Sequence, residues 1–291
     1  AAAPIWRATA MEALGDVGGR EATQTMAALL YDDDAIIRTS TVRSLQFLSL
    51  PQRFQLLTPL IDDDVTAVRM EVAVALAGVP LDQIPPQQAD MLRKLFAEYV
   101  SIQQQHAEMP GVLMQLGLFY ANRGDAPAAE ASYREALEIN PQLLAAYLNL
   151  ADLLRSGQRD DEARQLLLKA LGVAPQNSNT LHALGLLETR SGSSDKALDY
   201  LRQAAEMETL GTRHRFVYAI ALHDLGQPRE AIAQLDALLR QSPGDQQVLL
   251  ALANYSAELG EKDRARVYAQ QLLRLAPNNP NYQQLLQSLS N

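Results

Sequence analysis

The C-terminal two-thirds of the chain repeats one pattern of apolar and small residues every 34 positions. Proline occupies the same place at Pro141, Pro175, Pro243 and Pro277, and Thr209 fills the remaining slot. Apolar residues recur between these slots at helical spacing. Because proline ends a helix and disfavours helical geometry in the residue before it, each period predicts two helices that end at the proline.

Small residues keep the same register as the prolines. Such residues at fixed positions indicate where two helix backbones cross too closely for a larger side chain. Two sets are predicted to lie at these crossings: Ala129, Ala163, Ala197, Ala231 and Ala265 in the second helices, and Gly117, Ala151, Gly185, Ala219 and Ala253 in the first. The predicted turns between the two helices hold Gly124, Gly192, Gly226 and Gly260, with Gly157 one place early in the second unit.

This register resembles the tetratricopeptide repeat (TPR) over residues 110–277, in five units. The resemblance implies an all-α, right-handed solenoid. The polar tail at 278–291 is expected to form a short helix that caps the last unit, as the ends of solenoids require.

The N-terminal third has a different period. Arg7, Arg38 and Arg69 are 31 residues apart, and a leucine follows each by seven residues, at Leu14, Leu45 and Leu76. Apolar helices are predicted before these segments at 20–31 and 51–61. An apolar helix, an Asp-rich turn and a second helix with an arginine resemble HEAT repeats, here over residues 1–80. The first unit has only its second helix, IWRATAMEAL, so we expect the natural chain to continue upstream.

The segment between the two arrays, residues 81–109, begins with a proline-rich stretch and continues as a predicted helix, MLRKLFAEYVSIQQQHAEM. Two interpretations stay open. The helix bridges the two arrays, with a hinge before it, or it completes the HEAT-like stack.

Three consecutive aspartates occur twice, at 32–34 and 62–64. Carboxylates are ligands for Ca²⁺ or Mg²⁺, but metal loops space their ligands with intervening residues and glycine. The position of each run just before a helix favours capping of exposed amides and a favourable interaction with the helix dipole. The resemblance to HEAT repeats further implies pairing of such aspartates with Arg38 and Arg69.

Composition narrows the possible partners. The net charge of −9 disfavours nucleic acid as a partner. The absence of cysteine excludes thiolate metal sites, cysteine nucleophiles and covalent haem attachment in this chain. The longest apolar run, VAVALAGVPL, is shorter than the roughly 20 residues needed to cross a bilayer, so no membrane insertion is expected.

No pattern of a catalytic, cofactor or metal site is found. The four histidines, His106, His182, His214 and His223, form no HxxxH or HExxH pair, and GDVGG at 15–19 lacks the order of a phosphate loop. We therefore predict a chain that is not an enzyme and holds no cofactor.

In TPR solenoids the first helix of each unit lines the inner surface. The resemblance places thirteen residues in a partner-binding groove: Met114, Leu118, Asn122, Leu148, Asn149, Asp152, His182, Leu186, Arg213, Phe216, Ile220, His223 and Asn254. Asn149 matches the second-unit asparagine with which some family members clamp a C-terminal carboxylate. Met114 and Leu118 stand in place of the first-unit pair of that clamp, which disfavours this mode. A mixed, partly apolar groove is typical of binding to a peptide or protein.

The predicted function is therefore a non-catalytic scaffold for protein binding. The combination of HEAT-like and TPR units also resembles the C-terminal portion of bacterial multihaem c-type cytochromes. That resemblance implies the alternative, a cofactor-free domain in the periplasm that docks an upstream haem domain in cis or its redox partner. A cytoplasmic location is the other possibility.

Overall fold

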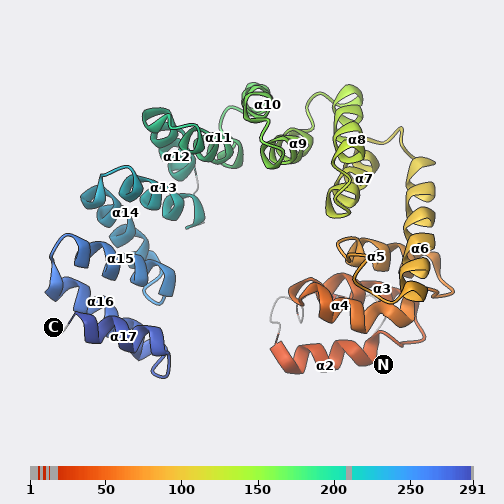
Figure 1. Cartoon of the computed structure of the whole chain (residues 1–291), viewed down its shortest axis with the longest axis horizontal. Helices are drawn as coiled ribbons and strands as arrows, with labels where there is room; N and C mark the ends of the chain where they lie inside the picture. Colours follow the sequence, from red (N-terminus) through yellow and green to blue (C-terminus); the bar gives the residue numbers. More distant parts are fainter. Residues whose placement is uncertain (1–5, 7–8, 11–12, 14–18, 208–211, 290–291) are drawn as a thin grey trace. The chain divides into compact units, whose positions relative to one another are not determined.

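The computed structural model describes residues 6, 9–10, 13, 19–207 and 212–289, and these residues form helices and turns without any strand (Figure 1). The α-helices are α2 (Gly19–Leu29), α3 (Ala35–Ser44), α4 (Leu50–Leu57), α5 (Thr66–Leu76), α6 (Pro86–Gln104), α7 (Pro110–Asn122), α8 (Ala126–Ile139), α9 (Leu144–Ser156), α10 (Asp160–Val173), α11 (Ser178–Arg190), α12 (Ser194–Met207), α13 (Arg213–Asp224), α14 (Pro228–Gln241), α15 (Gln246–Glu258), α16 (Lys262–Leu275) and α17 (Pro280–Ser288). Short 3₁₀ turns, η1 (Leu45–Phe47) and η2 (Thr58–Leu60), follow α3 and α4. The predicted all-α solenoid of helix pairs is confirmed.

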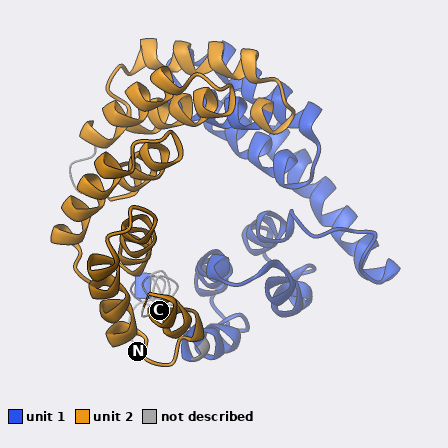
Figure 2. Ribbon diagram, turned by 60° about the vertical axis from the view of Figure 1, so that its left-hand side comes forward, with its two compact units in different colours: residues 1–153 blue, residues 154–291 orange. Residues whose placement is uncertain are grey.

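The chain divides into two compact units, residues 1–153 and 154–291, and α9 crosses the division (Figure 2). Unit 1 contains α2 to α8, and unit 2 contains α10 to α17. The predicted half repeat around Arg7 and Leu14, most of the GDVGG segment and Thr209 lie outside the described residues.

The first aspartate run caps a helix, as predicted. Asp34 is the N-cap of α3, and its side chain accepts a hydrogen bond from the amide of Ile36. Arg38 on the same helix donates from Nε and Nη2 to the two carboxylate oxygens of Asp63, at 2.8 and 2.9 Å. It also donates to the main-chain oxygen of Asp32. Arg38 thus joins the two aspartate turns of neighbouring helix pairs.

The second aspartate run differs from the prediction. The N-cap of α5 is Val65, without a side-chain cap, and Asp63 instead accepts from the Val65 amide while holding Arg38. Arg69 pairs with a glutamate, because its Nε and Nη2 donate to Glu98 on α6. The stack therefore continues its arginine–carboxylate ladder onto α6.

Helix α6 packs on both of its neighbours. It contacts α5 through the Arg69–Glu98 pair, and it contacts α7 through Phe96 and Tyr99, whose rings lie 5.5 and 4.6 Å from that of Phe119. A single apolar cluster runs from Met26 on α2 to Ala146 on α9. The HEAT-like pairs and the first TPR pair thus share one core, and the division of the chain at residues 80 and 110 stays a prediction.

Arg123 reinforces this junction from the end of α7. Its Nη1 donates to the main-chain oxygens of Ala77 and Val79, which follow α5, at 2.9 and 3.0 Å. Its guanidinium also lies over the ring of Phe96, 4.6 Å from the centroid. The segment after α5, predicted as a possible hinge, is held to the first TPR pair by these contacts.

The small residues of the TPR register lie where the pattern predicts. The five alanines of the second helices and Ala151, Ala219 and Ala253 are all buried. A methyl group on Gly117 would overlap the ring of Tyr133 on α8. A methyl group on Gly185 would lie 2.5 Å from Cγ of Leu201 on α12. Close helix crossing, and not turn formation, therefore requires these two glycines.

The turns between paired helices share one backbone geometry. Gly124, Gly192, Gly226 and Gly260 have positive φ angles between 75° and 83°. In the second TPR pair the residue with positive φ is Gln158, at 61°, and Gly157 comes directly before it. The pattern of hydrogen bonds is the same, because the Arg159 amide donates to the Leu154 oxygen as the Asp125 amide donates to that of Tyr120. A glutamine therefore adopts the left-handed conformation that favours glycine.

Helix α17 covers the last pair in unit 2. Leu285, Leu286 and Leu289 pack against Ala265 and Ala269 of α16. The main-chain oxygen of Leu289 accepts a hydrogen bond from Arg266 Nε at 2.9 Å. These contacts are those expected of the predicted capping helix, whose first residues, 278 and 279, precede α17.

Candidate functional site: clefts and exposed faces of the repeat helices

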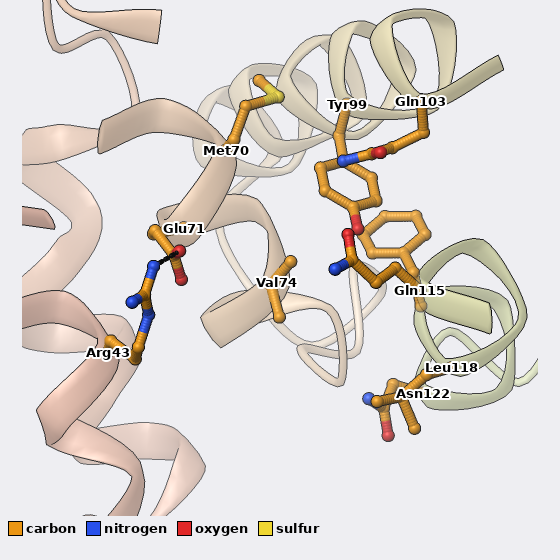
Figure 3. A pocket seen from close by; sticks show the side chains of 10 residues that line it. Arg43, Met70, Glu71, Val74, Tyr99, Gln103, Gln115, Leu118 and Asn122 are labelled. Atoms are coloured by element: carbon orange, nitrogen blue, oxygen red, sulfur yellow. Dashed lines mark hydrogen bonds and ion pairs between the residues drawn. The ribbon is translucent and has the colours of Figure 1, made fainter. Parts of the chain in front are cut away.

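One cleft of unit 1 lies where the HEAT-like pairs meet the first TPR pair. Helices α3, α5, α6 and α7 surround it, and its volume is about 340 Å³ (Figure 3). Its lining consists of Arg43, Met70, Glu71, Val74, Tyr99, Gln103, Gln115, Leu118, Phe119 and Asn122. We call it the junction cleft.

Apolar side chains line the base of the junction cleft. Val74 of α5 and Leu118 of α7 lie on opposite sides of it, and the ring of Tyr99 stands between α6 and α7 (Figure 3). Burial, together with the nearby carboxylate of Glu71, raises the pKa of Tyr99 to about 12, although a hydrogen bond with Gln103 acts in the opposite direction. Tyr99 therefore stays a neutral phenol at any physiological pH.

The polar groups of the junction cleft fall into two sets. Arg43 of α3 forms an ion pair with Glu71 of α5 at one side (Figure 3). Three carboxamides, Gln103, Gln115 and Asn122, come from α6 and α7 on the other side. The cleft can therefore offer both donors and acceptors of hydrogen bonds around an apolar base.

Two of the predicted groove residues, Leu118 and Asn122, line the junction cleft, and Leu118 is 50% exposed. Met114, one turn earlier on α7, is half-buried against the core of unit 1. Sequence reasoning missed the lining residues of α3, α5 and α6 because it sought a groove only on TPR helices, and it also passed over Gln115 and Phe119 on α7. A signal was available: Met70 and Val74 are four residues apart and share one helix face.

The other predicted residues of unit 1 lie on α9. Leu148 and Asn149 are half-buried, and Asp152 is exposed. The side chain of Asn149 forms a hydrogen bond with the hydroxyl of Tyr133 on α8, which acts against the rise in the Tyr133 pKa that burial causes. Asn149 thus has a partner within the fold.

In unit 2, the predicted residues of α11 differ in exposure. Leu186 is 45% exposed, whereas His182 is 8% exposed and its ring packs edge-on against that of His214 on α13, with centroids 5.0 Å apart. His182 therefore lies in the contact between α11 and α13, and its place in a partner-binding groove stays a prediction.

The remaining predicted residues of unit 2 lie on α13 and α15. Arg213 and Asn254 are exposed, and Phe216, Ile220 and His223 are half-buried. The His223 ring stacks on Tyr255, with centroids 3.6 Å apart, and its Nε2 lies 2.6 Å from a carboxylate oxygen of Glu258. Burial, with the Asp224 and Glu258 carboxylates adding to it, raises the pKa of Tyr255 to about 12.

The described residues contain no group of three or more His, Asp or Glu side chains arranged to hold a metal ion. None of the helices formed by the described residues combines the length and apolar character needed to cross a membrane.

Comparison with known families agrees with the repeat pattern. The tetratricopeptide repeat profile matches residues 101–186 and 222–289, more than half of the chain, and a second TPR profile matches residues 182–245. The HEAT repeat profile matches residues 1–100. The chain belongs to the tetratricopeptide repeat family. It is a TPR protein with HEAT-like repeats at its N-terminal end.

Individual relatives are distant. The chain is 29% identical over 169 residues to cellulose synthase operon protein C of Xanthomonas axonopodis pv. citri, which covers 53% of this chain and 11% of that protein. It is 28% identical over 157 residues to the type IV pilus assembly protein PilF of Pseudomonas aeruginosa, covering 53% of this chain and 62% of PilF. The chain thus spans less than two-thirds of the length of these relatives.

Solved structures share the fold. Yeast Tom70 superposes with a TM-score of 0.62 at 16% identity, covering 93% of this chain and 57% of Tom70. The TPR protein YrrB, described as having an unusual peptide-binding site, gives a TM-score of 0.50 at 20% identity, covering 66% of this chain and 96% of YrrB.

Proposed function

We propose that this TPR protein is a non-catalytic scaffold that binds a protein or peptide partner through the exposed faces of its first TPR helices. The observation that carries the proposal is the exposure of aliphatic side chains at matching places of the repeat. Leu118 on α7 and Leu186 on α11 are two repeats apart and are 50% and 45% exposed. Every other leucine of α7 and α11 is buried, so these two side chains are available as apolar anchors for a bound peptide.

The first helices of unit 2 carry further side chains that suit binding. In unit 2, Phe216 and Ile220 on α13 are half-buried, and Leu250 on α15 is partly exposed. Arg213 and Asn254 add polar groups beside these apolar side chains. A surface with apolar anchors and adjacent hydrogen-bonding groups suits recognition of a peptide. The site described for YrrB gives a precedent within the same fold.

Site-specific photocrosslinking tests the proposal. A photoreactive phenylalanine analogue replaces Leu118 or Leu186 in the full chain, expressed in the source cells. The matched controls are Ile139 on α8 and Leu168 on α10, second-helix residues that are each 46% exposed. We expect a discrete crosslinked partner from the first-helix positions and not from the second-helix positions. Equal crosslinking from both sets, or from the controls alone, would place the partner elsewhere and overturn the proposal.

An upstream domain in cis remains the alternative partner. The notion that this chain is the cofactor-free portion of a multihaem cytochrome rests on the combination of its repeats, and it is a prediction. The gene sequence upstream of residue 1 tests it: CxxCH motifs there would support docking of a haem domain, and their absence would rule out this alternative. Compartment and the exclusion of nucleic acid likewise stay predictions.

A further inference from the structure

The junction cleft differs from the rest of the proposed binding surface because it is built from both kinds of repeat. The HEAT-like helices α3 and α5 contribute Arg43, Met70, Glu71 and Val74, and the TPR helix α7 contributes Leu118 (Figure 3). Its chemistry restricts what it can bind.

The charges of the junction cleft balance each other. Arg43 and Glu71 are its two ionised lining residues, and they form an ion pair with one another. A charged side chain entering the cleft would lose hydration without gaining an uncommitted counter-ion, which is costly. The cleft therefore favours an uncharged segment.

The junction cleft, at about 340 Å³, has room for one inserted side chain of a bound segment.

The carboxamides of α7 have the spacing that an extended segment requires. Gln115 and Asn122 are both exposed and are seven residues apart on one helix, which places them about 10 Å apart along its axis. Three residues of extended chain span about the same length. Each carboxamide can donate to a main-chain oxygen or accept from a main-chain amide. Leu118 lies between the two, facing the cleft (Figure 3).

We propose that the junction cleft binds an extended, uncharged peptide segment. Gln115 and Asn122 hydrogen-bond its main chain, and a bulky aliphatic side chain of the segment inserts between Val74 and Leu118. This inference rests on the proposed scaffold function and names the partner chemistry of one part of that scaffold.

A selection with a defined probe tests the inference. A phage-displayed library of random 12-residue peptides is selected on the purified full chain, and each binder is then measured against Leu118→Glu, Gln115→Ala and Asn122→Ala. We expect binders that lose at least tenfold in affinity on Leu118→Glu and several-fold on each carboxamide variant. These binders should contain an uncharged stretch, and replacing its aliphatic residue with alanine should cost them at least tenfold. Ile139→Glu, of similar exposure, is the control and should leave binding unchanged.

Other outcomes are decisive as well. Leu118-sensitive binders that are highly charged, or that become helical on binding by circular dichroism, would overturn the inference. If every selected peptide kept its affinity for Leu118→Glu but lost affinity for Leu186→Glu, the result would support the scaffold function and contradict the inference about the junction cleft. If no peptide were selected at all, both would lose their support. Unchanged thermal unfolding of each variant ensures that a loss of binding reports on the cleft.

Discussion

The guanidinium of Arg38 donates two hydrogen bonds, of 2.8 and 2.9 Å, to the carboxylate of Asp63, which lies 25 residues later in the sequence. Both side chains are largely buried, and Arg38 also holds the main chain of the first aspartate turn. Bidentate pairs of this kind fix geometry as well as contributing energy. The doubled aspartate run therefore serves to lock neighbouring helix pairs together.

Removing the arginine should leave Asp63 buried without its partner. We expect Arg38→Met to lower the free energy of unfolding by about 2 to 3 kcal/mol, because a buried charge that loses its counter-ion is strongly destabilising. The control is Arg93→Met, whose pair with Asp90 is exposed on both sides and which should change stability by less than about 0.5 kcal/mol. Urea unfolding measures both. Equal effects would show that the Arg38–Asp63 pair is an ordinary surface contact.

The acid stability of unit 1 should depend on two carboxylates. Burial alone would raise the pKa of Asp63, but the hydrogen bonds from Arg38 and the Val65 amide outweigh it and lower the pKa. The hydrogen bond with Arg69 lowers the pKa of Glu98. Because the folded pKa values are depressed, the stabilisation is complete above the unfolded values, near 3.8 and 4.5, and is lost as the pH falls through the lower folded values.

Thermal unfolding between pH 6 and pH 2 checks this expectation. The unfolding temperature of the wild type should fall with acidification below about pH 4.5. Asp63→Asn should start lower and fall less steeply. A variant curve that runs parallel to that of the wild type would contradict the role assigned to Asp63.

Because α7 and α8 cross closely at Gly117, adding one methyl group there is predicted to lower the stability of the fold. Gly117→Ala forces an atom into the buried ring of Tyr133, and we expect a loss of about 2 kcal/mol despite the higher helix propensity of alanine. Gly111→Ala, on the same helix, meets no atom within 4 Å and should cost nothing. Chemical denaturation of the two variants compares them directly. A neutral Gly117→Ala would mean that α7 and α8 can separate at no cost.

The left-handed backbone conformation of Gln158 in unit 2 predicts that replacing it with glycine increases stability. Gln158 has φ 61° where the other turns between paired helices use glycine, so Gln158→Gly should relieve backbone strain. The greater freedom of glycine in the unfolded chain offsets part of the effect, and a net stabilisation of about 0.5 to 1 kcal/mol is expected. Gly192→Ala, which places a side chain at φ 75°, should destabilise by a similar amount. Differential scanning calorimetry measures both shifts.

The repeat register made most of the fold predictable from the sequence. Periodic small residues such as Gly117 and Ala129 report a helix crossing that is local and recurs, so their spacing is sufficient to identify the helix pairs. The turn at Gln158 could not be identified in this way, because Gly157 beside it offers the more usual residue. Arg69 was assigned to an aspartate, whereas its partner Glu98 lies on α6, beyond the last arginine of the 31-residue pattern.

The candidate site was less predictable. Leu118 and Asn122 were found because their places on α7 follow from the TPR register. Glu71 and Tyr99 were not, because the junction cleft arises from packing between two different kinds of repeat, and no single period describes it. His182 shares the register of Met114, Leu148 and Phe216, which are half-buried, yet contact with His214 buries it. Burial at such positions depends on the neighbour and not on the repeat.

The affinity of the full chain for its crosslinked partner tests the central claim most directly. Isothermal titration calorimetry with the purified partner should compare wild type, Leu186→Glu and Leu168→Glu. Leu186 lies on a first helix, α11, and Leu168 on a second helix, α10, and the two side chains are similarly exposed. We predict that Leu186→Glu weakens binding at least tenfold while Leu168→Glu leaves it unchanged. Equal dissociation constants for all three proteins would contradict a scaffold that binds through its first TPR helices.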